Sequence, residues 1–75
     1  MTDPTATPPT GVEWVEAFAT QLGVAPPDEA AIEQLLDLAG VAAHASERLA
    51  APLACYLVGQ AGLSPAEALD LARGT

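Results

Sequence analysis

The sequence predicts an all-α fold, a compact array of four short helices with the third helix central. Apolar residues recur at spacings of three and four, the period of a helix with one buried face. Capping residues, prolines and glycines separate four stretches of this kind, and alternation typical of strands is not found. The chain is 75 residues long, which allows one domain at most.

A leader at residues 1–10 precedes the first helix. It contains three prolines and four threonines but almost no large apolar side chain, so it cannot join a packed core and is expected to be flexible. A single helical domain is expected over residues 11–75. Thr10 and Glu13 match a capping box, in which each side chain accepts a hydrogen bond from the other residue's backbone amide.

The first helix, predicted over residues 11–22, carries an apolar stripe. Trp14, Phe18 and Leu22 recur every four residues and therefore share one face. Because the chain has only three aromatic residues, we expect Trp14 and Phe18 to be the main filler of the core. The alternative is an exposed stripe that binds a partner. Gly23 fits the left-handed position that ends many helices.

The second helix begins just after Pro27, and its far end is open. One face is apolar and the opposite face carries acidic residues, as in a helix that covers a core. It ends near Ala45 or continues toward Leu49, because nothing before Pro52 strongly breaks a helix.

The third helix is predicted to start at about residue 51, since Pro52 is tolerated in a first turn. The apolar segment that follows has little polar surface and is expected to be buried on several sides, and Gly59 suggests close approach of another helix. Ser64, Pro65 and Glu67 then open the fourth helix as N-cap, first residue and partner in a second capping box.

Charge and composition restrict the partners. Ten acidic residues against two arginines give a formal charge of -8, which repels nucleic acids and anionic membrane surfaces. The longest apolar stretch falls short of the roughly 20 residues that a membrane span needs. The N-terminus does not resemble a signal peptide, and the lone Cys55 lies in an apolar run, so we expect a buried, reduced thiol in a cytoplasmic protein.

The only histidine and one of the two arginines lie close together. On one continuous helix His44 and Arg48 would share a face and could hold a carboxylate or phosphate. The structural alternative is that Arg48 pairs with Glu47 or another acid while His44 covers a helix end. Pro52 and then Tyr56 follow. The Tyr56 hydroxyl either reaches this corner, or it is hydrated while the ring of Tyr56 packs in the core. These residues are the candidates for binding a partner or ligand: His44, Arg48, Pro52 and Tyr56.

Catalytic groups are not recognisable in the sequence. A nucleophile beside a base, metal-ligand spacing and a glycine loop for phosphate are all missing from it. Cys55 with His44 is the only conceivable pair of nucleophile and base, and apolar surroundings make a thiol less reactive. We therefore predict no catalytic residue, no metal and no cofactor, and we do not expect an enzyme.

The stretch from Leu35 to Gly59 resembles a small bacterial helical domain family of unknown function, found alone or fused to the C-terminus of molybdenum cofactor guanylyltransferase. The resemblance covers about residues 12–73 and is carried by "EW", "LLDLA", His44, Arg48 and "APLACYLVG". Small hydroxyl residues often stand in that family where this chain has Ala54 and Cys55, which weakens a ligand site there. The guanylyltransferase's nucleotide-binding glycine loop has no counterpart in this chain, so its activity is not carried over.

The resemblance implies association with molybdenum cofactor maturation, or with molybdoenzymes such as formate dehydrogenase. The leading hypothesis is a noncatalytic accessory domain that docks onto such a protein. One alternative is a small module that binds an anionic ligand at His44 and Arg48. Another is a self-associating domain, a homodimer whose third helix completes its core across a two-fold interface, because a chain this short buries only about 60% of its surface alone.

Overall fold

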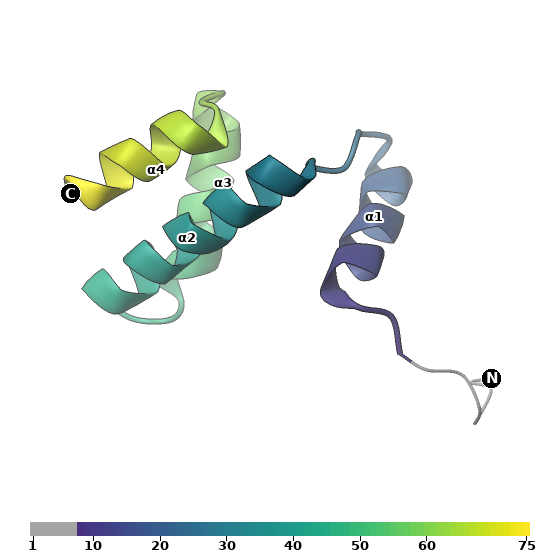
Figure 1. Ribbon diagram of the computed structural model, residues 1–75, viewed down its shortest axis with the longest axis horizontal. Helices are drawn as coiled ribbons and strands as arrows, with labels where there is room; N and C mark the ends of the chain where they lie inside the picture. The colour runs from purple at the N-terminus through teal and green to yellow at the C-terminus, as the bar shows by residue number, and fades with distance from the viewer. Residues whose placement is uncertain (1–7) are drawn as a thin grey trace.

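The computed structural model describes residues 8–75 as four helices joined by short connections (Figure 1). The helices are α1 (Gly11–Leu22), α2 (Glu29–Ala45), α3 (Ala50–Ala61) and α4 (Pro65–Arg73). The predicted all-α fold of four short helices is confirmed. Residues 1–7 of the predicted flexible leader lie outside the described residues.

Capping side chains set the starts of α1 and α4. The Glu13 amide donates to Thr10 Oγ1 at 3.1 Å, and the Thr10 amide donates to Glu13 Oε1 at 2.8 Å, which completes the predicted capping box. At α4 the Glu67 amide donates to Ser64 Oγ at 3.2 Å. The Glu67 carboxylate there accepts from the Ser64 hydroxyl at 3.0 Å, so the two side chains bond directly to each other.

The C-terminal end of α2 lies at Ala45. Ser46 leaves helical geometry, with φ of -141° and ψ of -93°, and its hydroxyl donates to the Ala42 carbonyl at 3.1 Å. The chain then turns and α3 begins at Ala50, with Pro52 in its first turn as predicted. Of the two predicted ends for this helix, the earlier one is therefore found.

The core lies among α2, α3 and α4. Leu38 of α2 is only 2% exposed and forms the buried cluster with Ala68 and Leu69 of α4. α2 packs against both α3 and α4. The half-buried residues packed on this cluster include three from α3, and together they are Val41, Ala54, Cys55, Val58, Leu63 and Ala72. Cys55 is a half-buried free thiol.

α3 joins the core through one face only. Leu53, Tyr56 and Leu57 on its other side are each more than half exposed. The expected burial of this helix on several sides is therefore wrong, because α2 covers one side and the opposite side is left open. A Cβ atom added at Gly59 would meet nothing within 4 Å, so the close approach expected there is not found either.

α1 stands apart from the other three helices (Figure 1). It ends at Gly23, whose φ of 73° confirms the predicted left-handed cap. Ala19 is its buried residue, whereas Trp14 and Phe18 are about half exposed and stack on each other with ring centroids 5.1 Å apart. The expectation that these two rings fill the core is wrong, because the buried cluster forms among α2, α3 and α4.

None of the helices in the described part of the chain combines the length and apolarity that crossing a membrane requires.

Candidate functional site

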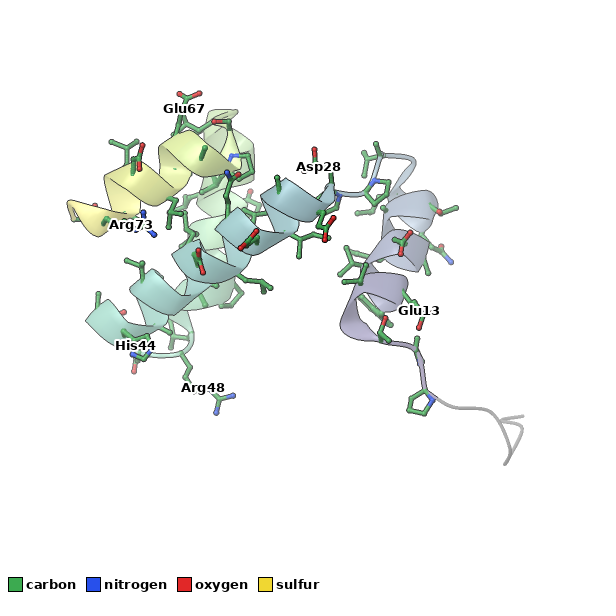
Figure 2. The ribbon with its side chains drawn as sticks, in the orientation of Figure 1. Glu13, Asp28, His44, Arg48, Glu67 and Arg73 are labelled. Carbon is green, nitrogen blue, oxygen red and sulfur yellow. The ribbon has the colours of Figure 1, made fainter. Side chains whose placement is uncertain are left out.

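His44 and Arg48 lie at the same end of the molecule, where α2 turns into α3 (Figure 2). His44 is in the last turn of α2, and Arg48 belongs to the connection after it; both are exposed. Because α2 ends at Ala45, the two residues do not share one continuous helix, and the condition under which they would lie on a common face is not met. The Arg48 side chain extends away from the ribbon into solvent.

The four predicted candidates are surface groups. Within residues 8–75, none of the side-chain hydrogen bonds involves His44, Arg48 or Tyr56. His44 lies in the last turn of α2, where a helix dipole favours a cation. Pro52 is exposed in the first turn of α3, and Tyr56 is 67% exposed one turn later.

A hollow of about 300 Å³ lies near this end of the molecule. None of the four candidates lines it, since its wall consists of Val41, Ala42, Ala45, Ser46, Ala50, Ala72 and Thr75. The corner thus offers the Arg48 guanidinium and, apart from it, the His44 imidazole to a surface that approaches it. Chemically, such groups can contact acidic side chains at the edge of an interface.

The outer face of α3 begins directly beside this corner. Leu49 precedes the helix, and Leu53, Tyr56 and Leu57 follow on the side away from the core, each more than half exposed. α3 contains no acidic or basic residue. This α3 outer face, defined by Leu49, Pro52, Leu53, Tyr56 and Leu57, is an uncharged apolar surface that connects the predicted candidates Pro52 and Tyr56.

A groove between α1 and the start of α2 is a second apolar surface, which the sequence does not predict. It comprises two adjoining hollows of about 410 and 360 Å³. Both hollows are lined by Val12, Val15, Pro27 and Ile32. The first also contains Glu16, Pro26 and Glu29, and the second contains Gly11, Leu35 and Leu36. We call this surface the α1–α2 groove.

Charge is distributed unevenly around the α1–α2 groove. From residue 8 to residue 43 the chain has no lysine, arginine or histidine, while its acids there are Glu13, Glu16, Asp28, Glu29, Glu33 and Asp37. Glu13 and Asp28 lie on the side of α1, whereas His44, Arg48 and Arg73 lie on the other side of the molecule (Figure 2). An apolar groove therefore lies within the acidic part of the protein.

Two features of the sequence are related to this groove. Pro26 and Pro27 separate α1 from α2, and the missing basic residues before His44 are visible in the sequence. Its periodicity predicts an apolar stripe on α1 but does not predict that this helix stands away from the core.

Comparison with known proteins gives the chain a family. No curated protein and no solved structure matches it. A family model described as a domain of unknown function matches residues 6–74, nearly the whole chain. This chain therefore belongs to the DUF6457 family of domains of unknown function.

Proposed function

We propose that this chain is a noncatalytic accessory domain that binds a protein partner through apolar surface left outside its core. The observation that carries the proposal is the distribution of large apolar side chains. Leu38 and Leu69 are buried, whereas Trp14, Phe18, Leu36, Leu53 and Leu57 are among many that stay about half exposed or more.

Single exposed apolar residues are common on proteins and need no explanation. Here they gather on two surfaces, the α1–α2 groove and the α3 outer face, and contiguous apolar surface of this kind is typical of interaction sites. A short chain with a small core has a further reason to bind, because a partner covers apolar area that its own helices cannot.

For the partner we propose a molybdoenzyme such as formate dehydrogenase, or a maturation factor of its cofactor. The support is the resemblance of the stretch from Leu35 to Gly59 to the domain found with the guanylyltransferase. In this proposal Pro52 and Tyr56 contribute apolar contacts from α3, and His44 and Arg48 supply hydrogen-bond donors at the edge of the same interface.

The test is co-purification of the tagged chain from its native host, with bound proteins quantified by mass spectrometry. We expect a molybdoenzyme or a maturation factor to be recovered with the wild type and less of it with Tyr56→Ala. Leu71→Ala is the matched control, because Leu71 is similarly exposed but lies on α4. Repeated recovery of neither class of protein would contradict the assignment of the partner, and the absence of any specific partner would contradict the interaction role.

A further inference from the structure

We propose that the α1–α2 groove binds an amphipathic helix of a partner protein, one whose apolar stripe is flanked by lysine or arginine. The inference rests on the proposed function, that the chain binds a protein, and adds which surface is used and what chemistry the partner presents.

The first argument is the shape and lining of the groove. Two helices diverge at the Pro26–Pro27 connection and leave an apolar channel between them, with Val15 on one wall and Leu36 on the other. Val15 is 40% exposed and Leu36 is 68% exposed, so neither wall is closed by the protein itself. A third helix laid into a groove of this kind buries its apolar face against both walls, which is a recurring mode of peptide recognition.

The second argument is charge. Glu16 and Glu29 line the groove directly, and Glu33 is one helical turn beyond Glu29 on α2. Basic residues are missing from residues 8–43, so every charged side chain in this part of the chain is a carboxylate. A helix with lysine or arginine beside its apolar stripe would bury the stripe and place its cations on these carboxylates. A helix flanked by acids would be repelled.

The same charges argue against a second copy of this chain as the occupant. Two copies that met through their grooves would bring the carboxylates of both acidic halves together, which is unfavourable at close range. The uncharged α3 outer face is the surface on which a second copy would meet no such repulsion.

The experiment is calorimetric titration of the full chain with a synthetic helical peptide of leucine and lysine, in which the leucines form one stripe. Two peptides serve as controls: the same pattern with glutamate in place of lysine, and a scrambled leucine–lysine sequence without a stripe. We expect only the striped lysine peptide to bind with defined stoichiometry, and we expect its affinity to fall as salt is added.

Matched variants locate the site. Leu36→Gln removes apolar contact from the groove, and Leu57→Gln makes the same change at a similarly exposed position on α3. We expect Leu36→Gln to weaken binding roughly tenfold, the effect of losing one buried leucine contact, while Leu57→Gln changes it by less than about twofold. Glu29→Gln should weaken binding more than Glu47→Gln, which removes the same charge in the connection that follows α2.

Several outcomes would overturn the inference. These are no binding of the striped lysine peptide, equal binding of the glutamate peptide, and equal effects of the two leucine substitutions. A dimer in sedimentation that Leu36→Gln dissociates would show that a second copy occupies the groove. If the native partner is captured and only α3 substitutions release it, the groove inference fails while the proposed function stands; if no partner is captured, the proposed function fails irrespective of the peptide result.

Discussion

Leu36 and Leu38 lie two positions apart on α2 and face different surroundings. Leu38 is 2% exposed inside the core cluster, and Leu36 is 68% exposed beside the groove. Residues two apart on a helix point in nearly opposite directions, so α2 has apolar residues on two sides. One side holds the molecule together, and the other is available for binding.

This pair gives a direct test of where the core lies. Leu38→Ala should destabilise the fold by about 2–4 kcal/mol, because it removes buried apolar contacts and leaves a cavity. Leu36→Ala, the matched control on the same helix, should change the free energy of unfolding by less than about 0.5 kcal/mol, the usual range for surface substitutions. Urea unfolding followed by circular dichroism measures both. Equal losses would contradict the assignment of the two sides of α2.

For single residues, the sequence predicted which side chains are candidates for binding but did not predict their positions relative to one another. His44 and Arg48 stand out in the sequence because basic residues are rare in this chain. Their joint placement depended on whether α2 continues past Ala45, and local signals did not decide that. The dihedral angles of Ser46 end the helix, so the two side chains belong to different segments.

On the scale of the helices, a helix start could be predicted from the sequence where its capping side chain lies within a few residues of it. Thr10 with Glu13 and Ser64 with Glu67 can be recognised from four consecutive residues, because the hydrogen bonds they form join residues three apart. The face that a helix buries depends on which other helix covers it. The apolar stripe of α1 and the apolar surroundings of α3 were visible in the sequence, but the sides left uncovered were not.

The two glycines of the α3 region should respond to alanine with opposite signs. Gly62 ends the helix with φ of 72°, which disfavours a side chain, so Gly62→Ala should destabilise by about 1 kcal/mol. Gly59 lies inside the helix with free space around its Cα, so Gly59→Ala should stabilise by about 0.5–1 kcal/mol. Thermal unfolding of both variants measures the sign. Destabilisation by Gly59→Ala would indicate a neighbour packed against that position.

Loss of the capping side chain at Ser64 and at Thr10 should differ in whether it lowers the stability of the whole fold or of one helix only. Ser64→Ala weakens α4, which supplies Ala68 and Leu69 to the core, so it should lower the stability of the whole fold by about 1 kcal/mol. Thr10→Ala weakens α1, which packs little on the rest, so helix content should fall while the urea midpoint of the main transition stays unchanged.

Circular dichroism at low and intermediate urea concentrations distinguishes these effects. Thr10→Ser is the control, because serine retains the capping hydroxyl. A shift of the main transition by Thr10→Ala equal to that of Ser64→Ala would show that α1 and the core unfold together.

On the scale of the whole molecule, the net charge of -8 is concentrated around α1 and the first part of α2. Like charges at this density destabilise the compact form, and dissolved salt screens them over about 8–10 Å near physiological ionic strength. Raising sodium chloride from low to physiological concentration should therefore increase the urea midpoint. A variant with Glu29→Gln and Glu33→Gln should show a smaller salt effect, and a midpoint independent of salt would contradict this account.

The arrangement of the four helices also predicts that the protein still folds when α1 is removed. The cluster of Leu38, Ala68 and Leu69 and the residues packed on it all come from α2, α3, α4 and Leu63, so a chain of residues 24–75 retains this cluster and loses only the buried Ala19. We expect it to unfold cooperatively, with a free energy of unfolding within about 1 kcal/mol of the full chain and a slightly lower dependence on urea, because less surface is exposed when it unfolds.

A full-length chain with Leu38→Ala should be much less stable than this shortened one. The shortened chain should also fail to bind the leucine–lysine peptide, because Val12 and Val15 form one wall of the groove. Loss of cooperative unfolding on removing α1 would show that this helix packs against the core in solution, and the groove would then be a closed interior surface instead of a binding site.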